Sequence, residues 1–203
     1  LVEAAAARGV PIWSEVEFAA RFLFGPIVGI TGTNGKTTTT ELTGAMLRDA
    51  GLPVVVAGNV GLALSRVPDL AAEGAPVVVE LSSFQLEHIE RFRPGVAVLL
   101  NITEDHLDRH GTMSAYAAAK LRLFENQDEE CVAVLNAEEP TLRDVSVPGR
   151  GRRAWFATAP VAGVPLAAGV EADGLWLDLA ALGLEGGRPT LCRPDELALR
   201  GLH

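Results

Sequence analysis

The sequence predicts an α/β domain with three layers, in which helices cover both faces of a mostly parallel sheet. Apolar strand-like runs alternate with amphipathic segments between residues 27 and 136, a pattern that favours parallel strands joined by helices. A glycine-rich loop leads from the first of these strands into a helix, as phosphate-binding loops do. After about Arg150, short segments rich in Gly, Pro and Leu predict a small antiparallel β region near the C-terminus.

The expected elements can be placed in chain order. An alanine-rich stretch comes first, and Ser14 with Glu17 forms the pattern of a capping box that opens a short helix before Gly25-Pro26. We expect strands at 27–31, 53–57, 76–80, 96–100 and 131–135, and helices at 36–50, about 84–92 and 114–125. The expected short antiparallel strands include Trp155-Phe156 and residues 174–179.

Composition excludes several classes of protein. The chain has 203 residues, enough for one large domain, and 48% of them are apolar, which suffices for a core. A net charge of −9 argues against nucleic acid as the main partner, and no stretch reaches the roughly 20 apolar residues of a membrane span. Cys131 and Cys192 stand far apart without a Cys-x-x-Cys pair, which disfavours a zinc site and fits a reducing cytoplasm.

The glycine-rich loop carries the clearest chemistry. Gly32 and Gly35 allow backbone N–H groups to approach an anion, and the following helix points its positive end toward the same place. Lys36 can reach nucleotide phosphates, and the Thr37 hydroxyl can join the shell of a magnesium ion. The usual pattern G-x-x-x-x-G-K-[ST] has glycine where this chain has Ile30, so an ordinary strand-to-helix turn is the alternative.

Three further polar motifs follow predicted strands, at 58–61, 80–83 and 101–106. Because parallel strands end at the same edge of a sheet, we expect all four motifs to converge on one site.

Each candidate residue in these motifs has a structural alternative. Glu80 can hold magnesium or simply end a strand, Ser82 can cap a helix or contact a ligand, and Asn59 can bind a ligand or form a turn. His106 and His110 lie four residues apart, but the Glu of H-E-x-x-H is absent, so His106 is a metal ligand or a structural hydrogen-bonding residue. From the residues alone, Lys120 is expected to face solvent.

Taken together, the four motifs resemble those of the Mur ligase family, ATP-dependent amide ligases that build the peptide of the bacterial cell wall. The resemblance is strongest from Val28 to Asn136, and the family's loop, Gly32-Thr-Asn-Gly-Lys-Thr37, has the short glycine spacing that accounts for Ile30. The motifs at 80–87, 101–110 and 119–124 look like those of the family member that adds D-glutamate.

The resemblance implies a role for each site residue. Lys36, Lys120 and His106 are expected to be catalytic, while Asn59 and Ser82 approach the substrate. The expected ATP-binding residues are Gly32, Thr33, Asn34, Gly35, Lys36, Thr37 and Thr38. Two magnesium ions are implied, with Thr37, Glu80, His106 and Lys120 as ligands, and Lys120 matches the family lysine that carries a carbamate.

The family's reaction implies the partners. ATP phosphorylates the alanine carboxylate of UDP-N-acetylmuramoyl-L-alanine, and the amine of D-glutamate attacks the acyl phosphate. The resemblance also implies a cytoplasmic monomer without nucleic-acid or membrane partners.

The resemblance further implies a division into domains. Residues 1–25 are expected to be the tail of an N-terminal UDP-binding domain with its linker, and residues 26–203 a central ATP-binding domain that is incomplete at its C-terminus. The family's C-terminal amino-acid-binding domain has no counterpart, so we expect this piece alone to have little ligase activity. The alternatives are another Mur or folylpolyglutamate synthase ligase, or a noncatalytic nucleotide-binding domain; the absence of N-K-x-D counts against a GTPase.

Overall fold

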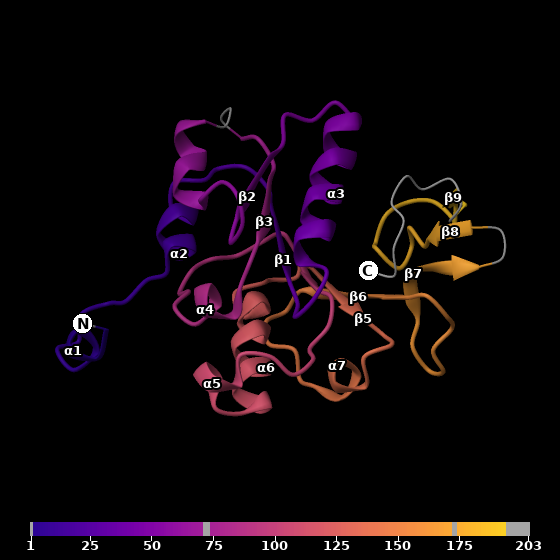
Figure 1. The fold of residues 1–203 in the computed structure, drawn as a ribbon. Coiled ribbons are helices and arrows are strands. Elements are labelled where there is room, and N and C mark those ends of the chain that lie inside the picture. Colours follow the sequence, from indigo (N-terminus) through magenta and orange to yellow (C-terminus); the bar gives the residue numbers. More distant parts are fainter. Residues whose placement is uncertain (1, 71–73, 172–173, 194–203) are drawn as a thin grey trace.

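The computed structural model describes residues 2–70, 74–171 and 174–193, and within them it forms one nine-stranded sheet flanked by helices (Figure 1). The strands are β1 (Ile27–Thr31), β2 (Val55–Gly58), β3 (Val77–Glu80), β4 (Val96–Leu99), β5 (Val132–Asn136), β6 (Arg152–Ala157), β7 (Leu166–Glu171), β8 (Gly174–Leu177) and β9 (Thr190–Cys192). The α-helices are α1 (Val2–Ala6), α2 (Glu15–Ala20), α3 (Lys36–Asp49), α4 (Ser83–Leu86), α5 (Leu107–His110), α6 (Met113–Leu121) and α7 (Pro140–Asp144). Two 3₁₀ helices, η1 (Leu64–Asp69) and η2 (Arg122–Phe124), complete the described elements.

The sheet has the strand order β2-β3-β1-β4-β5-β6-β7-β8-β9, and all pairs from β2 to β7 are parallel. This confirms the expected α/β class with a mostly parallel sheet. The expectation that Trp155-Phe156 lies in an antiparallel strand is wrong, because these residues belong to β6, which runs parallel to β5. The chain crosses through α7 between β5 and β6 and so returns to the same end of the sheet. Only β8 and β9 add antiparallel pairs, and they continue the same sheet.

The fourth helix is much shorter than expected, since α4 ends at Leu86 instead of near residue 92. The backbone N–H groups of Glu90, Arg91 and Phe92 donate to one carboxylate oxygen of Glu17, at 2.8 to 2.9 Å, instead of to helix carbonyls. The capping box expected between Ser14 and Glu17 is wrong in one respect, because the Glu17 side chain takes part in this loop contact. Ser14 does cap α2 by accepting from the N–H of Glu17, but the Glu17 carboxylate reaches across to this loop.

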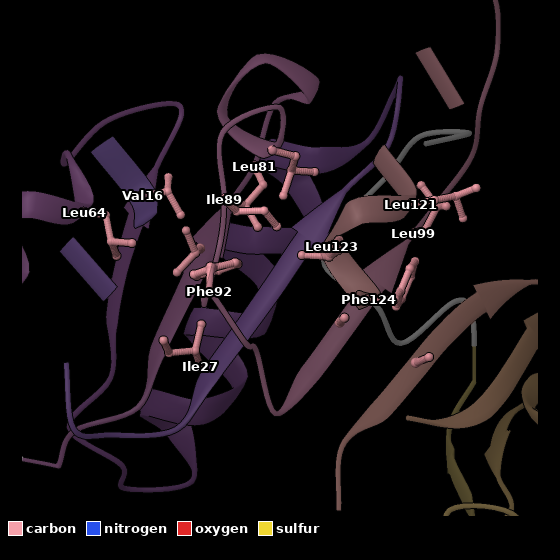
Figure 2. Close-up of a cluster of buried hydrophobic side chains, with 14 of the residues drawn as sticks. Val16, Ile27, Leu64, Leu81, Ile89, Phe92, Leu99, Leu121, Leu123 and Phe124 are labelled. Carbon is pink, nitrogen blue, oxygen red and sulfur yellow. The ribbon is translucent and has the colours of Figure 1, made fainter. Parts of the chain in front are cut away.

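Two apolar cores cover the two faces of the sheet. On one face, strand residues such as Ile27 and Leu99 pack against α2, α6 and η2, as Figure 2 shows for Val16, Leu123 and Phe124. On the other face, a smaller cluster consists of Ile30, Val54 and Val78, with Leu47 of α3 packed against it. The continuous Val and Ile content of the central strands is typical of strands buried on both faces.

The order of the strands brings the sequence motifs together. Strands β2, β3, β1 and β4 are direct neighbours, and each of the four polar motifs follows one of them. Because the four strands are parallel, the motifs share one edge of the sheet. Among the helices that the structure describes, none has the length and apolar content needed to cross a bilayer.

Candidate functional site

The glycine-rich loop joins β1 to α3 and is held in a closed turn by its own lysine. Gly35 has a φ of 80° and stands at the N-cap of α3, a left-handed position that favours glycine. The Nζ atom of Lys36 donates to the carbonyl oxygens of Gly32 and Thr33, at 3.0 and 2.8 Å. The first N–H groups of α3 lack helical partners, so the loop presents free donors and a cation to an anion.

Asn101, the second residue after β4, holds the loop from the neighbouring strand. Its side-chain oxygen accepts from the backbone N–H groups of Thr33 and Asn34, at 3.0 and 2.9 Å, and its amide donates to the carbonyl of Asn34 at 3.1 Å. Asn101 lies in one of the four sequence motifs, but the motif alone does not indicate this role. An asparagine that follows a strand adjacent to β1 was the available signal, although the pairing of β4 with β1 had to be known to use it.

Glu80 lies between the loop and the end of β2. Its carboxylate accepts from the hydroxyl of Thr37 at 2.7 Å and from the side-chain amide of Asn59 at 3.1 Å. Glu80 is only 3% exposed, and no Lys, Arg or His among the described residues forms an ion pair with it. A buried carboxylate with neutral partners alone is costly, so this arrangement fits a bound cation, and oxygen donors are those that Mg²⁺ prefers.

Gly58 permits the close approach between β2 and β3 that places Asn59. Its φ is 122°, and a Cβ atom there would lie 2.2 Å from the carbonyl oxygen of Glu80. The same carbonyl accepts from the N–H of Asn59 at 2.9 Å. Asn59 is therefore bound to Glu80 through both its backbone and its side chain.

Ser82 is the N-cap of α4. Its hydroxyl accepts from the N–H of Gln85 at 3.3 Å, and its own N–H donates to the Gln85 side chain at 3.0 Å, which completes a capping box. Ser82 therefore caps a helix, which was the structural alternative to a ligand contact. Ser82 lies two residues after Glu80, at the edge of the sheet where the four motifs meet.

Lys120 is buried, so the expectation from the residues alone that it faces solvent is wrong. It is 2% exposed, because its helix α6 packs on the sheet beside the loop. Its Nζ atom donates to the carbonyl of Gly32 at 2.8 Å and lies 4.6 Å from the centre of the Tyr116 ring. Burial, followed by the charge of Lys36, lowers the pKa of Lys120 to about 7.

His106 occupies a left-handed position with a φ of 51°, at the N-cap of α5. Its side chain is 47% exposed, and its Nε2 atom lies 3.4 Å from Asp105. Its ring is 5.0 Å from Phe84 and 6.3 Å from Tyr116, measured between ring centres. Within the described ranges, no three His, Cys, Asp or Glu side chains gather into a group that could hold a metal ion by themselves.

Tyr116 is a second residue to which the sequence analysis gave no role. It is 1% exposed, its hydroxyl lies 3.2 Å from that of Thr33, and burial raises the pKa of its phenol. It thereby links α6 to the loop. Thr38 lies in the first turn of α3, so all the expected loop residues from Gly32 to Thr38 surround one helix N-terminus.

The chain resembles known proteins in sequence. Residues 30–152 match the family model described as the Mur ligase middle domain. A UDP-N-acetylmuramoylalanine--D-glutamate ligase from Pelotomaculum thermopropionicum is 43% identical over 204 residues, which cover 100% of this chain and 43% of that protein. A ligase of the same name from Anaeromyxobacter dehalogenans is 56% identical over 151 residues, 74% of this chain and 32% of that protein. The chain thus spans less than half the length of these relatives.

Solved structures share the fold. The MurF ligase from Thermotoga maritima in complex with ADP has a TM-score of 0.59 at 22% identity, covering 81% of this chain and 40% of that one. The E. coli FolC in complex with DHPP and ADP has a TM-score of 0.55 at 16% identity, covering 87% and 52%. At these identities the comparison establishes the architecture alone.

Proposed function

This chain belongs to the Mur ligase family, and we propose that it forms the ATP-binding part of a ligase that adds D-glutamate to UDP-N-acetylmuramoyl-L-alanine in peptidoglycan precursor synthesis. The names of relatives at 43 and 56% identity support this assignment. We also propose that residues 26–203 belong to the central domain and that residues 1–25 are the end of a UDP-binding domain with its linker. Such a ligase would act in the cytoplasm as a monomer.

The observation that carries the proposal is the position of Glu80 between Thr37 and Asn59. The hydroxyl of Thr37 belongs to the loop expected to bind ATP, and Asn59 is expected to approach the muramoyl-alanine substrate. One buried carboxylate contacts both. The Glu80 carboxylate thus lies between the loop expected to bind the transferred phosphoryl group and the residue expected to approach the acceptor substrate.

ATP binding is assigned to residues 32–38. The N-terminus of α3 and the glycine backbone would hold the phosphates, and Lys36 would leave its two carbonyl partners to contact the terminal phosphates. The hydrogen bonds that the loop forms with Asn101 and Tyr116 would keep its shape before ATP arrives, which lowers the cost of ordering it.

Magnesium is assigned to Thr37, Glu80, His106 and Lys120, the last as a carbamate. The buried, cation-free carboxylate of Glu80 fits one ion, and the remaining ligands would come from phosphates and water, as is usual for this metal. When bound, Mg²⁺ supplies charge neutralisation on the phosphoryl oxygens.

Carbamylation of Lys120 is favoured by its surroundings. An amine reacts with CO₂ only when it is unprotonated, and a pKa of about 7 leaves a large neutral fraction near neutral pH. The ammonium first releases one proton to solvent. The neutral nitrogen then bonds to the carbon of CO₂, one C–O double bond opens to leave a carboxylate oxygen, and the nitrogen releases a second proton, so a cation becomes an anion. The product replaces repulsion between Lys120 and Lys36 by attraction and adds oxygen ligands at the loop.

The reaction then has two steps. A carboxylate oxygen of the alanine attacks the γ-phosphorus of ATP, and ADP leaves; the amine of D-glutamate next attacks the acyl phosphate, and inorganic phosphate leaves. Lys36 would offset the charge on the transferred phosphoryl group. Asn59 and Ser82 would hold the acceptor substrate so that its carboxylate meets the phosphate in line.

The test uses the longer protein that contains this chain. We expect ADP formation to require both UDP-N-acetylmuramoyl-L-alanine and an amino acid, with D-glutamate preferred and the amide identified by mass spectrometry. Preference for another amino acid or a folate substrate would indicate a different ligase of the superfamily, and ATP binding without turnover would indicate a noncatalytic domain. Because the chain spans less than half of its relatives, residues 1–203 alone should show little turnover.

A further inference from the structure

Ser83, His110 and Glu87 form a linked set of side chains beside the site. The hydroxyl of Ser83 lies 2.9 Å from Nε2 of His110, and Nδ1 of His110 lies 3.4 Å from a carboxylate oxygen of Glu87. The order is that of a nucleophile, a base and an orienting acid. Ser83, however, is only 1% exposed, so a substrate cannot reach its hydroxyl. The set must act by holding structural elements in place.

His110 is held in one orientation from all sides. The carboxylate of Glu87 favours a proton on Nδ1, which leaves Nε2 to accept from the Ser83 hydroxyl. The His110 ring stacks on Phe84 with an interplanar angle of 6° and lies 5.1 Å from the Tyr116 ring, between centres. Its side chain is 4% exposed. A ring fixed in this way can hold the segments that contact it in place.

Three helices meet at this ring. His110 ends α5, whose N-cap is His106, and its N–H donates to the His106 carbonyl at 3.0 Å. Ser83, the hydrogen-bond partner of the His110 side chain, is the first residue of α4, whose N-cap is Ser82. Tyr116 of α6 continues the contact to the loop through Thr33. A change at His110 therefore affects the position of α4 and α5 relative to the loop.

We propose that His110 is a positioning residue for the acceptor substrate, because its hydrogen bond to Ser83 fixes the turn that carries Ser82. The inference rests on the proposed function, in which Ser82 contacts UDP-N-acetylmuramoyl-L-alanine. Besides its contact with Tyr116, the loop is held by hydrogen bonds with Asn101 and Lys36, and these bonds do not involve His110. Loss of the bond to Ser83 therefore weakens binding of the acceptor substrate much more than binding of ATP.

The test is His110→Phe in the longer protein, which keeps the ring stack on Phe84 and removes both nitrogen atoms. The KM for UDP-N-acetylmuramoyl-L-alanine should rise roughly tenfold, as for the loss of one buried hydrogen bond, while the KM for ATP stays within about twofold. Ser83→Ala removes the same bond from the other side, so the double variant should be no worse than either single variant. His88→Phe, outside the set, is the matched control.

Additive effects, or an unchanged KM for the acceptor in His110→Phe, would overturn the inference. If the unsubstituted protein forms no ADP with these substrates, the proposed function fails instead. Hydrogen exchange of the Gln85 and Leu86 amides then tests whether His110 holds α4 in place. Exchange roughly tenfold faster in His110→Phe, with α3 unaffected, supports the positioning role, and unchanged exchange in α4 rejects it.

Discussion

Lys36 and Lys120 donate to the same carbonyl oxygen, that of Gly32, at 3.0 and 2.8 Å. Burial lowers the pKa of Lys120, and repulsion from the ammonium group of Lys36 lowers it further, to about 7. The two lysines therefore have different roles. Lys120 is the lysine of this pair that we propose to carry the carbamate.

Replacing Lys120 tests the carbamate. Lys120→Met keeps most of the side-chain length but cannot bind CO₂, and we expect ADP formation by the longer protein to fall by roughly 100-fold or more. In the unsubstituted protein, ¹³C NMR in labelled bicarbonate should show a carbamate signal that Lys120→Met lacks. Full activity of Lys120→Met would rule out a catalytic role for this lysine.

Lys36→Ala should reduce ADP formation by roughly 100-fold, since it removes the charge that we propose faces the transferred phosphoryl group. Stability should change little, because the Lys36 side chain is partly exposed and its bonds within the described residues go to loop carbonyls. Arg48→Ala, in the last turn of the same helix, is the control and should keep its activity. Intact amino-acid-dependent turnover in Lys36→Ala would contradict the assigned role of the loop.

Glu80→Gln separates stability from activity. The amide is nearly the same size and removes a buried charge that has no cationic partner among the described residues, so the thermal midpoint should stay the same or rise. ADP formation should nevertheless fall roughly 100-fold and need more Mg²⁺. Glu138→Gln changes a carboxylate that instead bonds to Thr158, so its magnesium dependence should be normal. A normal magnesium titration of Glu80→Gln would remove Glu80 from the metal site.

Asn101→Ala should raise the KM for ATP roughly tenfold, because three hydrogen bonds to Thr33 and Asn34 are lost and the loop is less ordered before binding. The matched control is Asn126→Ala, which loses a single amide–carbonyl bond to Phe92, near the start of β4 and away from the loop. Equal effects of the two substitutions on the KM for ATP would show that Asn101 has no special part in nucleotide binding.

The contacts of the Glu17 carboxylate predict that the free energy of unfolding depends on pH. Burial alone would raise its pKa, but the N–H groups of residues 90–92 and Arg21 outweigh this effect and lower the pKa below 4.5. A lowered pKa means that the stabilisation is complete above pH 4.5 and is lost as the pH falls through the folded-state value. Urea unfolding should show this loss in the unsubstituted chain.

Glu17→Gln should remove most of that acid dependence and cost about 1–3 kcal/mol at pH 7, because an amide oxygen replaces a carboxylate that binds three N–H groups. Glu90→Gln changes an exposed carboxylate nearby and should have little effect. Equal unfolding free energies of Glu17→Gln and the unsubstituted chain at pH 7 would refute the role of this contact.

Much of the site could be predicted from local sequence. The strand and helix around the loop, from Ile27 to Asp49, were placed almost to the residue, because β-branched runs and Gly-Lys-Thr are local signals. The convergence of the four motifs followed from strand-end geometry. It is confirmed by the contacts of Glu80 with Thr37 and Asn59 and by the contact of Asn101 with the loop. The predicted end of a helix was wrong where a residue distant in the sequence binds the backbone, as Glu17 does in the loop after α4.

By itself, the amino-acid sequence determined the α/β class, the glycine-rich loop between strand and helix and the edge of the sheet at which polar residues gather, because these depend on periodicity and on neighbours in the chain. Only the tertiary structure decided that Lys120 is buried against Gly32, that Asn101 holds the loop and that His110 bonds to Ser83. Those contacts join residues far apart in the chain. Their burial and pKa values depend on which strands and helices become neighbours, which no local pattern specifies.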